Sequence, residues 1–199
     1  MALTLNGSNN TIAGLAVGGL PDGIVDNDMI ANTTIAEGKL AANVNTITEA
    51  DLWRIHSTFE SAGAFLTSNW ERADETGAGY IGTGMSQSSG VFSFPSTGIW
   101  NIRAHWVIAE SGQSIRYAGI YVHTTTNNSS YAEVAIGQSN LFNDGTSCWA
   151  SGSTSLNFDV TDTSNCKIKF NVSSQASLSW IGASTGNYTH VVFTRLGDT

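Results

Sequence analysis

The sequence predicts an all-β protein, folded as a two-sheet sandwich or jelly roll. From about residue 50 onward, segments of alternating apolar and polar residues recur about every ten positions, the spacing of short strands in such folds. Gly, Asn and Ser separate these segments, and no helical pattern alternates with them as it would in a parallel α/β fold. The 6 Trp, 5 Tyr and 8 Phe supply enough large side chains for a core, which excludes a disordered chain.

The clearest strand covers residues 99–108 and follows a turn at 95–98. Its side chains alternate, with Asn101, Arg103 and His105 on one face. The opposite face, which we expect to be buried, holds Trp100, Ile102, Ala104 and Trp106.

Further strands are expected along the rest of the chain. A polar loop at 124–130 and a hairpin-type Asn-Asp-Gly turn at 143–145 separate some of them. The expected strands cover residues 114–123, 131–136, 156–160, 167–172, 177–181 and 190–196.

The stretch at 48–59 fits two patterns. Leu52, Ile55 and Phe59 fall on one face of a helix, and Thr48 with Asp51 resembles a helix-capping box. Alternation of apolar and polar residues also fits the same stretch. We expect a short helical turn or bend that leads into a strand.

The first 47 residues differ in composition from the rest, because they contain no aromatic residue. Apolar residues recur about every five positions, which matches neither a helix stripe nor a strand face. One copy cannot bury them, whereas several copies side by side can, as in intertwined fibres. A flexible linker is the alternative. The repeating residues are Leu20, Val25, Ile30, Ile35, Leu40 and Val44.

The charge content is unusually low. Only 12% of the 199 residues are charged, about half the usual share, and the net charge is -8. Eight basic residues cannot form a stripe that follows phosphates, so we expect no nucleic-acid partner, and no apolar run is long enough to insert in a membrane. The N-terminus lacks the pattern of a signal peptide. The surface is therefore rich in Ser, Thr and Asn, or other subunits cover much of it.

No motif for catalysis, metal binding or a cofactor stands out. The histidines lie far from any nucleophile motif, and Glu71, Asp74 and Glu75 are expected in a solvated loop with a local Arg72 pair. We therefore expect no enzyme, no cofactor and no metal. Cys148 and Cys166 leave two readings open, a disulfide between neighbouring strands or two buried thiols, and the small number of cysteines favours the thiols.

Recognition is the better-supported chemistry. Aromatic side chains in polar loops can stack on sugars or bury at partner surfaces, because their rings are rigid and amphipathic. Trp149, expected in the polar loop NDGTSCWASGSTS, is the first candidate for receptor or glycan binding, and Tyr131 is the second. The competing reading is that Trp149 caps one end of the sandwich.

Three blocks resemble known families. LNGSNNTIAGLAVGGLPDGIVDNDMIA resembles the N-terminal segments of tailed-bacteriophage fibre proteins, particularly those of marine phages and cyanophages. IGTGMSQSSGVFSFPSTGIW and NYTHVVFTRLGDT resemble the first and last strands of C1q/TNF-like jelly rolls at the ends of such fibres. This resemblance implies a homotrimer in the virion, with the terminal strands in the sheet between subunits. One departure is that the chain has almost no shaft.

The resemblance completes the functional expectation. Residues 1–47 would form an extended segment for virion attachment or trimer intertwining, through the apolar repeat, and 48–199 a jelly-roll knob. Host attachment by a homotrimeric tail fibre or spike is the expected function, with other virion proteins and a host glycan or protein receptor as partners. A head decoration appendage and a polysaccharide depolymerase are the alternatives. The protein would be assembled in the bacterial host cytoplasm. We assign to the core or the trimer axis Trp100, Trp106, Tyr121 and Phe158.

Overall fold

A computed structural model describes residues 4–6, 11–13 and 47–199 of the chain. The chain divides into two units, Met1–Asn45 and Thr46–Thr199. In the first unit, strand β1 (Thr4–Asn6) pairs antiparallel with β2 (Thr11–Ala13). The apolar repeat from Leu20 to Val44 lies outside the described residues.

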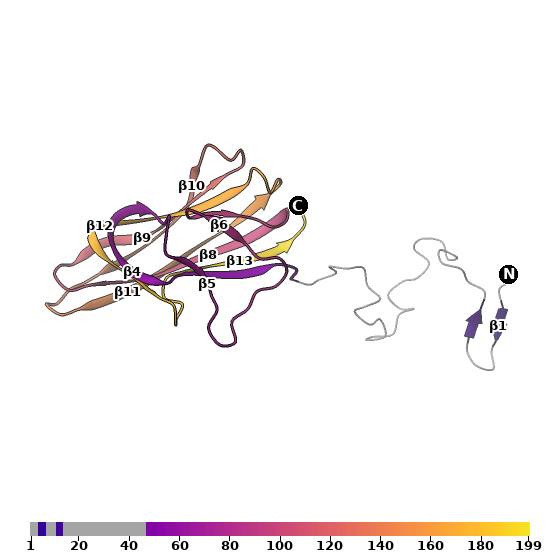
Figure 1. Ribbon diagram of the computed structural model, residues 1–199, viewed down its shortest axis with the longest axis horizontal. Coiled ribbons are helices and arrows are strands. Elements are labelled where there is room, and N and C mark those ends of the chain that lie inside the picture. Colours follow the sequence, from indigo (N-terminus) through magenta and orange to yellow (C-terminus); the bar gives the residue numbers. More distant parts are fainter. Residues whose placement is uncertain (1–3, 7–10, 14–46) are drawn as a thin grey trace. The chain divides into compact units, whose positions relative to one another are not determined.

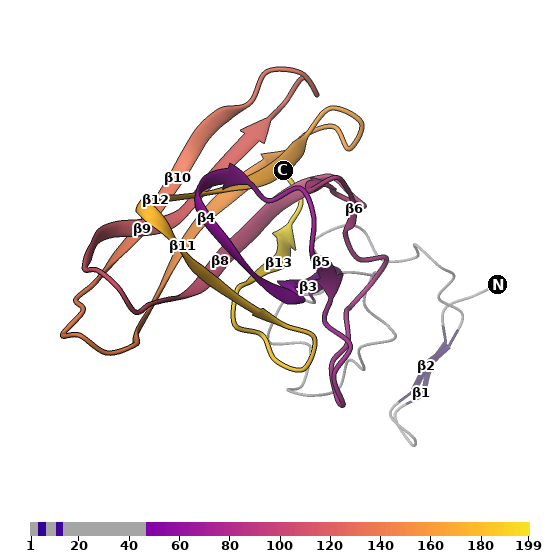
Figure 2. The same cartoon turned by 60° about the vertical axis from the view of Figure 1, so that its left-hand side comes forward.

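The second unit is a jelly roll of two layers, and its long strands are drawn in Figure 1. In the first layer the hydrogen-bonded order is β11-β8-β13-β3-β5. The last three lie side by side (Figure 2). Their bounds are Cys148–Val160 for β11, Gly98–Glu110 for β8, His190–Gly197 for β13, Ala50–Ile55 for β3 and Trp70–Arg72 for β5.

The second layer has the order β10-β9-β12, and two short strands run along the free edge of β12. Ser179 and Trp180 of β12 also pair with β8, which links the two layers. The bounds are Ala132–Leu141 for β10, Ile115–Thr125 for β9 and Lys167–Ala183 for β12; along its edge lie β4 (Ser57–Phe65) and β7 (Val91–Ser93), and β6 (Ser86–Ser88) pairs with β7.

The core between the layers comes from the alternation read in the sequence. On β8 the predicted buried face is confirmed, since all four of its side chains are at most 1% exposed. Trp100 and Trp106 belong to the core, and Phe158 packs against it. Tyr121 does not belong to this core, because its hydroxyl faces Gln138 on the outside of the β9–β10 pair.

Several expected elements differ from the structure. The helical turn at 48–59 is wrong: β3 and β4 cover that stretch, and no residue described in the knob is helical. The expected strands at 167–172 and 177–181 are one strand, β12, whose register shifts between Ser173 and Leu178. The block at 81–100, expected as the first strand, forms β6, β7 and the start of β8, and β3 is the strand that pairs with the last one.

The register defines two opposite ends of the knob. Ala50, where β3 begins, pairs with Thr194, and Thr194 pairs with Asn101 near the start of β8. Trp149 pairs with Ala109, near the end of β8. At about 3.4 Å per residue, about 27 Å of strand separates Asn101 from Ala109. The chain therefore enters the jelly roll at one end, and Trp149 lies at the other.

Candidate functional site

Trp149 does not lie in a loop, because β11 begins one residue before it. It is the cross-strand partner of Ala109, Ala109 is the partner of Ser179, and Ser179 is the partner of Glu60. Cross-strand partners carry their side chains on one face of a sheet. Four strands, β11, β8, β12 and β4, thus place one residue each in a row across the end of the knob, which we call the Trp149 row.

A pocket of about 200 Å³ opens along this row. Ala109 contributes only a methyl group to it, and Ser179 and Glu60 line it as well. Trp149 is the cross-strand neighbour of Ala109 and lies beside the pocket, outside its lining. Trp149 is 58% exposed, so an aromatic side chain is open to solvent next to the pocket. The lining residues are Glu60, Ala109, Glu110, Ser111, Ser147 and Ser179.

The polar groups of the pocket are held in place by hydrogen bonds. The hydroxyl of Ser179 donates to Oε1 of Glu60. The backbone N–H groups of Ser111 and Gly112 donate to Oε1 of Glu110, at 3.0 and 2.8 Å, so the loop after β8 fixes this carboxylate. No lysine or arginine lines the pocket. The pocket therefore offers hydroxyls and two carboxylates without a lysine or arginine in its lining, and the exposed side chain of Trp149 lies beside it.

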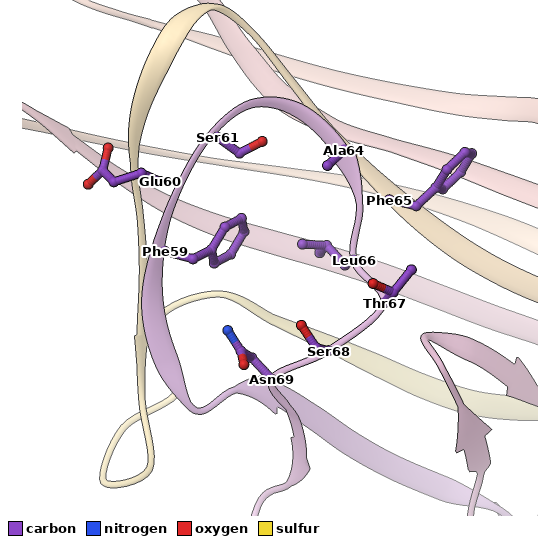
Figure 3. Close-up of a pocket in the computed structure, with 9 residues that line it drawn as sticks. All are labelled: Phe59, Glu60, Ser61, Ala64, Phe65, Leu66, Thr67, Ser68 and Asn69. Carbon is purple, nitrogen blue, oxygen red and sulfur yellow. The ribbon is translucent and has the colours of Figure 1, made fainter.

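A second hollow, of about 240 Å³, lies inside the curved segment 59–69 (Figure 3). Phe59 and Leu66 point into it, whereas Glu60 points away from it. Two indole N–H groups fix the walls: Trp180 donates to the carbonyl of Ser61 at 3.0 Å, and Trp70 to that of Leu66 at 2.8 Å. These hydrogen bonds hold the segment that carries Glu60, the β4 member of the Trp149 row, against its neighbours.

Tyr131 lies elsewhere, and the structure does not bring it together with Trp149. It precedes Ala132, which pairs with Thr124, so it sits at the end of β9 where β12 begins, whereas the Trp149 row crosses the far part of β12. Its ring packs under the ammonium group of Lys169, 4.1 Å from the ring centre. Burial raises the pKa of the Tyr131 hydroxyl. Tyr131 thus belongs to a packed cluster at the other end of the knob.

The carboxylates of the 70–75 region bind a buried arginine. Glu71, Asp74 and Glu75 all form ion pairs with Arg54, whose side chain is 0% exposed. Burial by itself would lower the pKa of Arg54, and the bonds to these carboxylates overcome it and raise the pKa. The expected local pair with Arg72 is wrong, because that arginine pairs with Asp51. These carboxylates hold the fold together and do not face one another across an open cleft.

Two histidines stack on the outer face of the first layer. The rings of His105 and His190 lie 4.9 Å apart at 28°. Nδ1 of each lies near the carbonyl oxygen of Tyr188, at 2.8 and 3.3 Å, so each Nδ1 carries the donated proton. Burial lowers the pKa of His190, and the charges of His105 and Arg103 lower it further, against hydrogen bonds to the backbone that raise it.

Other candidate chemistry is limited in the described residues. Cys148 and Cys166 are both free thiols, so of the two readings left open the disulfide is wrong. Cys166 is buried, as expected, whereas Cys148 is only partly buried. Within residues 47–199 and the two short strands before them, no group of three His, Cys, Asp or Glu side chains could hold a metal ion. No helix of this part is long and apolar enough to cross a membrane.

Trp149 was predicted from the sequence as a binding residue, whereas the other residues of this site were not. Glu60 and Ser179 are placed in one row with Trp149 only by strand pairing between distant segments, and neither belongs to a recognisable motif. Glu110 ends β8, which the sequence predicted, but nothing marked its carboxylate as part of a pocket. The one usable signal for a pocket in the sequence was Ala109, a small residue among larger ones near the end of a strand.

Comparison with solved structures identifies the fold. Murine APRIL at pH 5.0 is similar with a TM-score of 0.54 and 11% identity, over 74% of this chain and 98% of that one. Eiger TNF from S. frugiperda is similar with a TM-score of 0.55 and 9% identity, over 77% of this chain and 96% of that one. No family model and no curated protein matches the sequence. The knob is therefore a TNF-like jelly roll, as predicted.

Proposed function

We propose that the chain is a structural and binding protein of a tailed-phage virion, a homotrimeric fibre or spike whose knob attaches the particle to its host. The observation that carries this proposal is the position of the Trp149 row. It lies about 27 Å of strand away from the end at which the chain enters the jelly roll. A knob tethered through its N-terminal segment would present this row outward.

Three copies would pack through the outer face of β8 and β13. These strands lie in the layer that also holds β3, so the first and last strands of the knob meet there. Half-buried Val192 and Val107 give this face its apolar contacts, and Asn101 and Thr194 are short enough for close approach. Trp149 lies beyond these four residues at the end of the face, and so at the rim of the proposed contact between copies. Three copies of one weak site would then bind a host surface with avidity.

A head decoration appendage with the same knob remains the second form of this proposal, and it differs in where the N-terminal segment docks. The depolymerase reading finds less support, because Arg54 binds the most clustered carboxylates of the knob. Glycosidases need two carboxyl groups that face one another across the scissile bond.

Immuno-electron microscopy of the phage particles tests the proposal. Antibodies raised against the knob should label the distal tips of tail fibres or spikes. Label on the capsid would replace the tail assignment by the head appendage. Particles that carry no label, with the protein present only in the infected cell, would overturn the virion function altogether.

A further inference from the structure

We propose that the pocket of the Trp149 row binds one ring of an uncharged sugar or an amino sugar and excludes acidic sugars. This inference rests on the proposed attachment function, and it adds the chemical class of the ligand. It uses three features of this end of the knob: the exposed Trp149 beside the pocket, a cavity of about 200 Å³, and two carboxylates in a lining without lysine or arginine.

The indole ring provides the platform. Trp149 is rigid and apolar on its face, which suits the C–H face of a sugar ring. Its strand register holds it beside Ala109, whose methyl group leaves the space next to the indole open. A side chain larger than alanine at position 109 would occupy the space in which the sugar ring is expected to lie. The platform and the space beside it therefore fit a flat, compact ligand with one apolar face.

The carboxylates provide the polar contacts. Glu60 and Glu110 each use one oxygen for the protein's own donors, Ser179 in the first case and two backbone N–H groups in the second. The second oxygen of each can accept a hydrogen bond from a sugar hydroxyl or ammonium group, and hydrogen bonds to a charged acceptor are the stronger kind. Polar groups that are already held in place can fix the orientation of a bound ligand.

The same carboxylates determine what the pocket rejects. A uronic or sialic acid would bring its own carboxylate next to Glu60 and Glu110, and no lysine or arginine lines the pocket to compensate. Like charges placed together across an interface act against a ligand and so create specificity. The ligand class therefore follows from the charge of the pocket.

Saturation-transfer NMR on the full-length protein tests this inference. One panel of free sugars holds hexoses, 6-deoxyhexoses, hexosamines and N-acetylhexosamines, and a second holds glucuronic, galacturonic and N-acetylneuraminic acids. At least one sugar of the first panel should receive magnetisation, and none of the second. Replacing the indole, W149A, should weaken that binding about tenfold, and W149F should retain most of it.

Two further variants sharpen the test. Phe142, 78% exposed and near the same end of the knob, lies outside the row, so F142A should bind like the wild type. E60Q should reduce binding of amino sugars and relax the exclusion of acids. Binding of acidic sugars by the wild type, equal binding by W149A, or no transfer to any sugar of the first panel would overturn the inference. Fibre-tip labelling of virions together with any of these results would leave the attachment function standing without this ligand.

Discussion

Arg54 shows how much a single side chain contributes to the knob. It is fully buried, and three carboxylates, one from β5 and two from the segment after it, bind its guanidinium group. Replacing it by methionine would leave these carboxylates without their cation. We expect R54M to lower the free energy of unfolding by about 3 kcal/mol, the lower end for a broken buried ion pair, because the carboxylates remain partly in water.

Chemical denaturation measures this change. The matched control is R116M, which removes an exposed arginine that donates a hydrogen bond to the neutral side chain of Gln175. The control should change stability by less than about 0.5 kcal/mol. Equal losses in the two variants would show that Arg54 has no special role.

His190 predicts a dependence of stability on pH. Burial, with the charges of His105 and Arg103, lowers its pKa in the folded chain, so the unfolded chain binds the proton more readily. Burial and the charge of Lys169 also lower the pKa of His123, against Glu133. The contribution of these two histidines to the free energy of unfolding is complete above about pH 6.5, and it is lost as the pH falls from there toward their pKa values in the folded chain.

Unfolding at pH 7.5 and 5.5, at one protein concentration, checks this sign. The wild type should be less stable at pH 5.5, and H190N should lose part of that difference. The lowered pKa values of Glu75, Asp144 and Asp162 act below this range and do not disturb the comparison. Greater stability of the wild type at pH 5.5 would contradict the assignment.

Single residues differ in how well the sequence predicts their place. Alternation identified the buried face of β8, because a strand has a fixed period of two. The exposure of Trp149 also followed from its polar neighbours. The partners of Trp149 and Arg54 could not be predicted, because Ser179 and the carboxylates come from other strands and turns. Their positions depend on register, which a single sequence does not encode in a short motif.

Strand packing around Trp106 depends on two glycines of neighbouring strands. A Cβ added at Gly152 of β11 would lie 2.4 Å from Cζ2 of Trp106, and one at Gly137 of β10 would lie 2.5 Å from Cη2. The fully buried indole therefore fills the space that these glycines leave, where β10 and β11 approach each other. We expect G152A to lower the free energy of unfolding by about 2 kcal/mol through overpacking.

Thermal and chemical unfolding of G152A measure this cost. The control is G79A, since a Cβ at Gly79 would meet nothing within 4 Å. The control should unfold like the wild type. If G152A did so too, the indole would have room to move, and this account of the contact would be wrong.

Strand patterns explain which elements the sequence predicted. β8, β9 and β13 alternate large apolar with polar residues, and their positions were confirmed within a few residues. The first half of β11 was missed because CWASGSTS is made of small and polar residues and carries no apolar alternation. At 48–59 helix and strand patterns coincided, and pairing with β13 and β12 selected the strand.

The low charge content acquires a more specific meaning in the whole molecule. The outer face of β11 is made largely of serine and asparagine side chains, among them Ser151, Ser153 and Asn157. Arg103 is the one arginine or lysine that β8, β11 and β13 place in the middle of the outer face of the first layer. Short polar side chains permit close packing of copies without burying unpaired charge.

Trimer formation is the central claim, because both the shared outer face and the avidity of the Trp149 row depend on it. Multi-angle light scattering on the full-length protein, over a range of micromolar concentrations, measures it directly. We predict a constant molar mass of three times the 21.0 kDa of one chain. A constant mass of 21.0 kDa, that of a stable monomer, would contradict the account.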